Sequence, residues 1–471
     1  MTGAPARGDH PGPHTPGPHT PGPPALDGEA LRAPFARAAT PVERVGLEIE
    51  TGLVDPETGR AARYEGARGV RSVLATALAE WGGEPRADAG TLTGVALPDG
   101  SGLSLEHGGQ LEYSSAPVVG LGRAVADAEA ALRRLAALAD RFGLALLPGA
   151  QLPFERLETV PWVPMSRGAV MRDFFARTGE PAARATTIMS MSLSTQVHLD
   201  HLSAEDFAHK LRMLVAAAPV VAALLVNSPL TGGRSNGMLS HRSYGWLRMD
   251  PRRCGLLRPA LHPDVSVDDI VDWALRIPMI YYRTADGRYR IAPDRPFAEL
   301  LADGFDDGSV PTAAHWNSHL SQIWTDVRVR RTFELRSADG PPHRGIPALA
   351  ALWVGLGYHP PSCRAAWQLL RHHTAAEYQA LLDALPYEGP RARLGGSPVG
   401  ELAAELVRLA RAGLTARVRD GLEPPGVLGH LEPLDEILAT GRTFAEQCLA
   451  RWESDLRGDP ARYVAAYRIR P

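Results

Sequence analysis

We expect the chain to fold around the stretch Leu105-Glu106-His107-Gly108-Gly109-Gln110-Leu111-Glu112-Tyr113-Ser114-Ser115-Ala116-Pro117, in which two short apolar and acidic runs meet at a glycine pair. Paired glycines supply the positive φ that tight hairpin loops need, and apolar residues alternate with polar ones on both sides. The stretch therefore predicts a β-hairpin that carries two carboxylates, those of Glu106 and Glu112.

The length of the hairpin loop decides how these carboxylates are placed. With a two-residue loop, Gly108–Gly109, Glu106 pairs with Leu111 and the glutamates lie on opposite faces, because side chains alternate along a strand. With a three-residue loop, Gly108–Gln110, Glu106 faces Glu112 directly. Like charges placed opposite each other destabilise a sheet, so the second register requires a cation between them.

The composition is that of an ordinary globular protein, with 44% apolar and 22% charged residues in a chain of 471. A net charge of −3 gives no reason to expect nucleic acid or an anionic membrane as a partner, so small molecules are the expected ligands. The three cysteines are far apart in sequence, which indicates free thiols in a reducing compartment. The longest nearly apolar run, Met213–Val226, contains Pro219 and is too short to span a membrane. We therefore expect a soluble cytoplasmic protein.

The N-terminal residues 1–38 differ in composition from the rest of the chain. They contain the imperfect repeat Pro11–Pro23, rich in proline, glycine and histidine, which is typical of a disordered or polyproline-like tail. Residues 39–471 are expected to form a single catalytic domain whose C-terminal part, 346–471, is mostly helical. A further helix is predicted over Arg123–Phe142, where alanine and leucine are frequent and Gly143 follows.

The stretch Arg44–Val54 predicts a strand with two faces. Aliphatic residues alternate with glycine and acids, which places Glu48 and Glu50 on one face. Ser192–Asp200 repeats this design and places Gln196, His198 and Asp200 opposite its aliphatic residues.

The stretch Val327–Arg336 gives the strongest strand pattern. By parity, one face carries Arg328, Arg330, Thr332, Glu334 and Arg336. Three guanidinium groups around one carboxylate are typical of a phosphate clamp with a metal ligand in its midst.

Two segments between these strands have the composition of binding loops. Gln151–Arg172 is rich in proline and ends with Arg167 and Arg172, which could reach an anionic substrate. A glycine-rich segment leads to a loop at Arg242–Trp246, which includes Tyr244.

Together these strands predict an α+β fold, with helices on the apolar side of a sheet and a concave, charged side opposite. Hard cations that bind phosphates prefer carboxylate oxygens, so the charged side is a candidate Mg²⁺ site. The candidate ligands are Glu48, Glu50, Glu106, Glu112 and Glu334. The sequence has no GxxxxGK[ST] motif, no strand-embedded GxGxxG and no GxSxG elbow between a strand and a helix, which argues against P-loop, Rossmann and nucleophile-elbow sites.

Several motifs in this order resemble the glutamate–cysteine ligases of the plant and proteobacterial type, which include relatives in ergothioneine biosynthesis. The resemblance spans roughly residues 41 to 468. It rests on GxExE at Gly46–Glu50, on Glu106–Glu112 against E-P-G-G-Q-F-E, on Gln196–Asp200 against Q-V-N-L-D, on Asn227-Ser228-Pro229, on the Arg242–Trp246 segment, and on Val327–Gly340 against V-R-x-K-R-x-x-E-x-R-x-A-D-G.

The resemblance implies a fold similar to the catalytic domain of glutamine synthetase, in which a curved, mainly antiparallel sheet forms a funnel with helices outside. It also implies that ATP phosphorylates the γ-carboxylate of glutamate and that the amine of cysteine then displaces phosphate. The implied cofactors are two or three Mg²⁺ ions, with ATP as co-substrate, in a monomer or homodimer.

Matching motif positions implies a role for each candidate residue. The implied metal ligands are Glu48, Glu50, Glu106, Glu112, His198 and Glu334. Arg330 and Arg336 are the implied catalytic residues, which would bind phosphates. The implied substrate-binding residues are Arg167, Arg172, Gln196, Arg242, Tyr244 and Trp246. A metal shared by several strands favours the odd-length hairpin loop, with Glu106 and Glu112 on one face.

Departures from the family pattern leave the substrates open. Ile49 stands where the plant-type enzymes have histidine, His107 where they have proline, and Ser115 and Ser337 where they have glycine. Three hypotheses follow: ligation of glutamate to cysteine, ATP-dependent ligation of glutamate or a similar acid to a different amine, and a non-catalytic nucleotide-binding relative. A carboxylate–histidine metallohydrolase is a fourth, weaker hypothesis.

Overall fold

The computed structural model describes residues 26–36, 42–177 and 181–471, so the tail predicted for residues 1–38 lies outside the described residues except for 26–36. Inside that stretch, however, Gly28–Arg32 forms helix α1 and Ala33–Phe35 a 3₁₀ helix, η1. The side chain of Phe35 is buried, and Leu31 accepts a hydrogen bond through its carbonyl from the indole of Trp316. This segment is therefore not part of a tail, because its apolar residues are anchored on the folded protein.

The main sheet contains nine strands among the described residues, in the order β14-β15-β7-β1-β5-β4-β3-β2, with β6 also paired to β1. The strands are β1 (Val45–Val54), β2 (Glu84–Asp88), β3 (Thr91–Ala96), β4 (Gly102–Leu105), β5 (Leu111–Ser114), β6 (Ala145–Pro148), β7 (Thr195–Leu199), β14 (Val327–Val329) and β15 (Phe333–Leu335). All pairings within it are antiparallel, which confirms the predicted fold class. Strand β1 lies between β5 and β7, so side chains on its polar face have cross-strand neighbours on both sides.

The hairpin at β4–β5 has neither of the two predicted registers. Leu105 pairs with Leu111, and the Glu106 amide donates to the Gln110 carbonyl at 2.9 Å, so the loop is His107–Gly109. The sequence shows the glycine pair but not that the Gln110 side chain holds the loop, by accepting from the Gly108 amide at 2.9 Å. The loop has an odd length, and Glu106 and Glu112 share one face as predicted, two residues apart along the strand pair.

The predicted strand Val327–Arg336 is wrong in its shape, because the chain turns back on itself and forms the β14–β15 hairpin. Arg328 pairs with Glu334, and the Arg330 amide donates to the Thr332 carbonyl at the turn. No glycine, proline, asparagine or aspartate marks the turn, and the one break in the alternation is Arg331, a charged residue at a position of the aliphatic face. Because a three-residue turn preserves parity, Arg328 and Glu334 still share a face.

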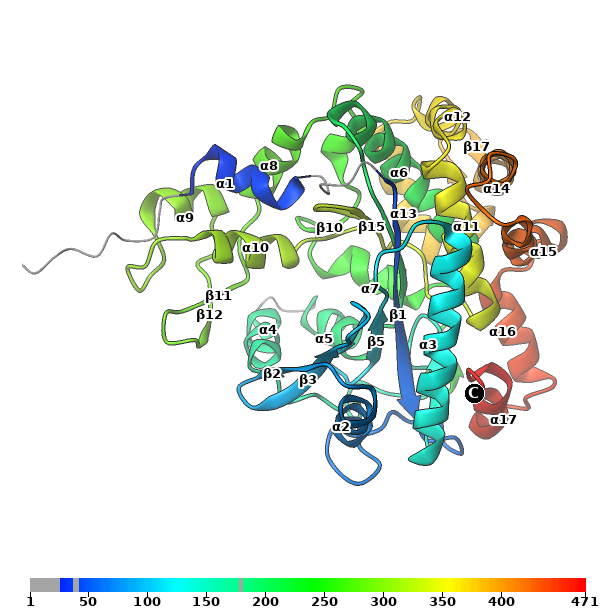
Figure 1. The fold of residues 1–471 in the computed structure, drawn as a ribbon, viewed down its shortest axis with the longest axis horizontal. Helices are drawn as coiled ribbons and strands as arrows, with labels where there is room; N and C mark the ends of the chain where they lie inside the picture. The colour runs from blue at the N-terminus through cyan, green and yellow to red at the C-terminus, as the bar shows by residue number, and fades with distance from the viewer. Residues whose placement is uncertain (1–25, 37–41, 178–180) are drawn as a thin grey trace, which may run out of the picture.

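Helices lie on both sides of β1 (Figure 1). On one side are α3 (Leu121–Arg141), α11 (Ile346–Gly357), α14 (Val399–Arg419), α15 (Glu432–Thr440), α16 (Phe444–Glu453) and α17 (Pro460–Tyr467). On the other are α4 (Ser166–Ala176), α5 (Pro181–Met191) and α7 (His241–Met249). The predicted loop Gln151–Arg172 is irregular as far as Met165, but Arg167 and Arg172 lie on α4. The predicted loop Arg242–Trp246 is wrong, because these residues lie on α7.

The remaining helices extend this arrangement. They are α2 (Val70–Trp81), α6 (Ala204–Leu224), α8 (Val267–Leu275), α9 (Phe297–Asp303), α10 (Ala313–Ser321), α12 (Pro360–Leu370) and α13 (Ala375–Glu388). Short two-stranded pairs join β8 (Leu230–Thr231) to β9 (Arg234–Ser235), β10 (Cys254–Gly255) to β13 (Trp324–Thr325), β11 (Tyr281–Arg283) to β12 (Tyr289–Ile291), and β16 (Arg393–Leu394) to β17 (Ser397–Pro398).

Helix α6 is the one described helix that is long and apolar enough to cross a membrane by length and composition. Its apolar window is 83% buried inside the protein. The helix begins at a Ser203 cap, whose hydroxyl accepts from the Asp206 amide at 3.0 Å. The apolar surface of α6 is therefore used as core packing.

Candidate active site

A cavity of about 260 Å³ is lined by residues of the sheet together with residues of α4, α5 and α7. Nine of the predicted site residues line it: Glu48, Glu50, Glu106, Glu112, Arg167, Gln196, Arg242, Trp246 and Arg336. They come from strands and helices that are far apart in sequence. The cavity therefore joins an acidic wall on the sheet to a basic wall on the helices and on β14–β15.

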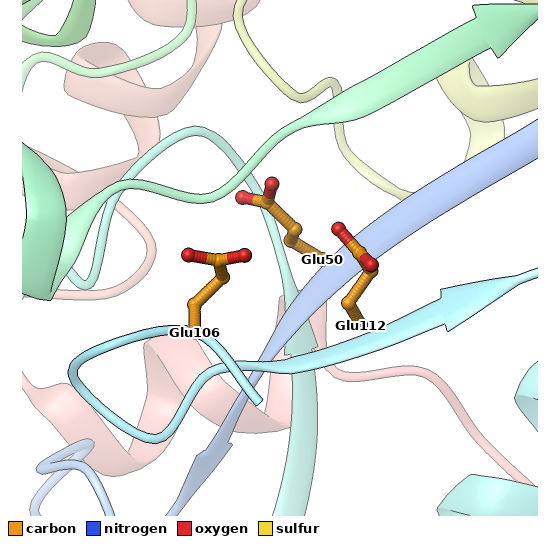
Figure 2. Close-up of side chains that lie close together, drawn as sticks. All are labelled: Glu50, Glu106 and Glu112. Atoms are coloured by element: carbon orange, nitrogen blue, oxygen red, sulfur yellow. The ribbon is translucent and has the colours of Figure 1, made fainter. Parts of the chain in front are cut away.

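Three carboxylates meet on the acidic wall (Figure 2). Each of Glu50, Glu106 and Glu112 offers an oxygen, and these oxygens all lie within 4.8 Å of one another. Glu50 and Glu112 are direct cross-strand partners. Gln196 donates to Glu50 at 3.0 Å, and Ser104 donates to Glu112 at 2.7 Å.

The electrostatics of this cluster favour a bound cation. Burial, and then the charge of Glu106, raise the pKa of Glu50 to about 7. Burial, and then the other glutamates, raise the pKa of Glu112 well above its usual range. A divalent cation would offset this repulsion, and an all-carboxylate set of oxygen donors suits Mg²⁺. The residues present therefore fit a hard metal ion.

The other three predicted metal ligands lie beside this cluster and bind protein groups. His198 Nε2 is 3.2 Å from Glu48, and its Nδ1 is 3.1 Å from the Thr332 hydroxyl. Arg328 Nε is 2.7 Å and Arg336 Nη1 3.2 Å from Glu334. None of Glu48, His198 and Glu334 belongs to the three-carboxylate cluster found among the described residues.

Charge pairing sets the protonation of Glu334 and His198. Burial alone would raise the pKa of Glu334, but Arg328 and Arg336 lower it to about 2. Burial alone would lower the pKa of His198, but the neighbouring Glu48 raises it. Glu334 is therefore an ionised anchor that holds two guanidinium groups at the cavity.

The arginines of the basic wall are held in place by specific contacts. Arg336 lies 5.3 Å from the ring centre of Trp246. Arg242 donates to the carbonyls of Ala338 at 3.1 Å and Arg336 at 3.0 Å. Arg242 thus lines the cavity and also holds the segment that follows β15.

Five predicted site residues do not line the cavity: His198 and Glu334, described above, and Arg330, Arg172 and Tyr244. Arg330 lies at the β14–β15 turn and donates to the Asn317 carbonyl at 3.2 Å. The guanidinium of Arg172 stacks on Trp162 at 4.7 Å. Tyr244 contacts Arg248 at 4.4 Å, on the other face of α7 from Arg242 and Trp246, because residues four apart share a helix face and residues two apart do not.

The sequence analysis missed two aromatic residues of the cavity, Trp324 and Tyr281. They lie on the short strands β13 and β11, outside the two-faced patterns used to find the site. Trp324 packs against Trp246 with ring centres 5.8 Å apart. Arg328 also lines the cavity, as the shared face of Val327–Arg336 indicates.

Residues 44–466 match the sequence model of glutamate-cysteine ligase family 2 (GCS2). The chain belongs to this family. It is 31% identical over 416 residues to the chloroplastic glutamate–cysteine ligases of Brassica juncea and Arabidopsis thaliana, covering 88% of this chain and 78% and 77% of those proteins. The resemblance seen in the motifs is thereby confirmed.

The fold also matches a solved structure of a glutamate–cysteine ligase. The crystal structure of the enzyme from Francisella tularensis in complex with AMP superimposes with a TM-score of 0.52, covering 90% of this chain and 88% of that one. At 12% sequence identity, this match shows a common fold.

Proposed function

We propose that this member of the glutamate–cysteine ligase family joins the γ-carboxylate of glutamate to the amine of cysteine at the expense of ATP. The observation that carries the proposal is the cavity in which a three-carboxylate cluster faces the Arg328–Glu334–Arg336 group. Carboxylates that attract divalent cations, beside guanidinium groups that bind phosphate, are what phosphoryl transfer requires.

The proposed reaction has two steps. A γ-carboxylate oxygen of glutamate attacks the γ-phosphorus of ATP, the bond to the β–γ bridging oxygen breaks, and ADP leaves. The amine of cysteine then attacks the carbonyl carbon of the acyl phosphate, phosphate leaves, and the amine loses a proton. Neither step needs a nucleophile from the protein.

The chain's own residues position and stabilise these groups. Glu50, Glu106 and Glu112 would hold two or three Mg²⁺ ions, which when bound neutralise phosphate charge. Arg328 and Arg336 present N–H donors at an orientation set by Glu334, where negative charge develops during transfer.

Apolar side chains in the cavity wall would protect the acyl phosphate from water. Trp246, Trp324, Tyr281 and Met171 line it beside the charged groups. Apolar side chains exclude water from a reactive intermediate that hydrolysis would otherwise consume. Arg167, which lines the cavity from α4, is the candidate partner for a substrate carboxylate.

A different amine substrate is the second candidate. The observation that favours it is His107, which lines the cavity where the family has proline. The side chain is 4% exposed, and its Nδ1 has no hydrogen-bond partner among the described residues. A donor or acceptor at this position could select a substrate that the plant-type enzymes do not use.

Product analysis tests these candidates. Purified protein with Mg-ATP and glutamate should release ADP much faster when cysteine is added, with a product of the mass of γ-glutamylcysteine. A panel of other amines, read by product mass, tests the second candidate. No response to cysteine over a wide concentration range would contradict the first, and no turnover with any amine would favour a non-catalytic nucleotide-binding relative.

We also propose a cytoplasmic location and a monomeric or homodimeric state, acting on small molecules without membrane or nucleic-acid partners. The three cysteines Cys254, Cys363 and Cys448 are free and buried, which supports a reducing compartment. Size-exclusion chromatography with light scattering measures the oligomeric state.

A further inference from the structure

A second, basic cleft lies among α3, α16, α17 and the 3₁₀ helix η3 (His343–Gly345). These labelled helices lie on the side of β1 opposite α4 and α5, which border the acidic cavity (Figure 1). The cleft has a volume of about 500 Å³ and shares no lining residue with the acidic cavity. It is therefore a separate feature of the molecule.

The wall of this basic cleft has a strong excess of cationic side chains. Five arginines line it, together with His343: Arg133, Arg344, Arg451, Arg468 and Arg470. No aspartate or glutamate side chain is among its lining residues. A concave surface with charge of one sign raises the local concentration of oppositely charged ligands.

Acids outside the wall neutralise this charge only in part. Arg133 is 3.5 Å from Glu129 and Arg451 is 3.8 Å from Asp455. Arg344 pairs with Glu436 at 2.5 Å, and Arg468 pairs with Asp140. Among the described residues, no carboxylate lies within ion-pair distance of Arg470. Since a guanidinium has five N–H donors and one carboxylate engages at most two, donors remain for a ligand.

Aromatic rings hold two of these arginines in place. Arg344 lies 5.7 Å from the ring centre of Phe444, and Arg451 lies 5.2 Å from that of Tyr467. Gln447 accepts a hydrogen bond from Arg344 at 2.9 Å. Stacked and hydrogen-bonded guanidinium groups lose less side-chain entropy when they bind an anion.

We propose that the basic cleft is a second ligand site, for a small anion with several charges, borne by phosphate or by several carboxylates. Its volume lies in the range typical of small-molecule sites, about 300–1,000 Å³. Planar guanidinium groups bind both phosphate and carboxylate in bidentate geometry, so both chemistries suit the wall. The proposal does not depend on which reaction the acidic cavity catalyses.

The test measures binding of two probes, inorganic pyrophosphate and citrate, to the full chain by isothermal titration calorimetry in metal-free buffer. The cleft variant is Arg451→Gln with Arg470→Gln, which removes two cleft charges together with one long, exposed ion pair to Asp455 and the contact of Arg451 with the Tyr467 ring. The matched control is Arg442→Gln with Arg462→Gln, which removes the same charge near α16 and on α17 outside the cleft. Arg336→Gln reports binding in the acidic cavity.

We expect the wild type, the control and Arg336→Gln to bind at least one probe with similar affinity. The cleft variant should bind it at least about tenfold more weakly, because it lacks two guanidinium groups that would donate charged hydrogen bonds to the anion. The tighter probe identifies the phosphate or the carboxylate chemistry. The proposal is overturned if neither probe binds the wild type at millimolar concentration, or if binding survives in the cleft variant and is lost in Arg336→Gln.

Discussion

Replacement of Glu112 by glutamine should stabilise the metal-free protein and at the same time weaken its binding of Mg²⁺. In the absence of metal, Glu112 lies in a cluster of like charges with Glu50 and Glu106. Burial and the neighbouring glutamates raise the pKa of Glu112, so the folded protein must either bear its charge or keep a proton on it; glutamine does not ionise, avoids both costs and keeps the shape of the side chain. The amide oxygen can still accept the hydrogen bond that Ser104 donates at 2.7 Å.

The magnitude follows from the separation of the carboxylates, whose oxygens lie within 4.8 Å of one another. At that distance, Coulomb's law with an effective dielectric constant of about 20 gives roughly 3 kcal/mol for each pair of full charges. Proton uptake reduces this repulsion, because the pKa of Glu50 is raised to about 7 and the pKa of Glu112 is raised well above its usual range. We therefore expect the free energy of unfolding of metal-free Glu112→Gln to rise by about 1–3 kcal/mol at about pH 8.

The assay is urea denaturation with EDTA, paired with calorimetric titration of Mg²⁺ into the metal-free protein. Glu423→Gln is the matched control, because Glu423 is also buried but accepts from the amides of Leu121 at 2.8 Å and Gly122 at 3.0 Å. It also pairs with Arg417 at 3.2 Å. The control should lose about 1–3 kcal/mol, because the charge of Glu423 is satisfied by its partners.

The critical result is that the free energy of unfolding rises in Glu112→Gln and falls in Glu423→Gln. If metal-free Glu112→Gln loses as much stability as Glu423→Gln, the carboxylates do not repel one another and the electrostatic reasoning is wrong. For Mg²⁺, we expect the affinity of Glu112→Gln to fall at least about tenfold. An unchanged affinity would remove Glu112 from the set of metal ligands.

Three further predictions concern pH and the basic wall of the cavity. Between pH 4.5 and about 7, the folded state keeps a proton on Glu50 that the unfolded state has released. The metal-free protein should therefore lose stability as pH rises through this window, and urea midpoints that rise with pH there would contradict this. Arg336→Gln should lower kcat by roughly 100-fold or more in an ADP-release assay, whereas Arg330→Gln, at the hairpin turn, should change it by less than about threefold; equal losses would place Arg330 at the phosphates after all. Arg167→Gln should raise the KM for glutamate by at least about tenfold with a smaller effect on the KM for ATP, and the reverse pattern would assign Arg167 to the nucleotide.

Much of the site was predictable because strand parity is local. The alternation in β1 placed Glu48 and Glu50 on one face, and both line the cavity. Their partners could not be predicted in the same way, since Glu48 lies beside His198 while Glu50 joins the cluster with Glu112. The difference arises because β1 is paired with β7 on one side and β5 on the other.

Three predicted site residues lie away from the cavity for related physical reasons. Arg330 shares the parity of Arg328, Glu334 and Arg336, which predicts a place at the phosphates, but the β14–β15 turn carries it away from the cavity. Similarly, Tyr244 and Arg172 were assigned from segments taken as loops. On helices α7 and α4, the 3.6-residue period turns them away from the residues that line the cavity.

The amino-acid sequence by itself determined the family, the antiparallel class of the sheet and most of the acidic and basic residues of the cavity, because motif order and two-residue periodicity are properties of the local chain. The tertiary structure alone decided which carboxylates meet. Gln196 and Glu50 are hydrogen-bonded although they lie 146 positions apart, and Glu112 joins them through β5. Strand order and register are long-range choices, set by the packing of the whole sheet, and they distinguish a three-carboxylate cluster from a row of glutamates on one face.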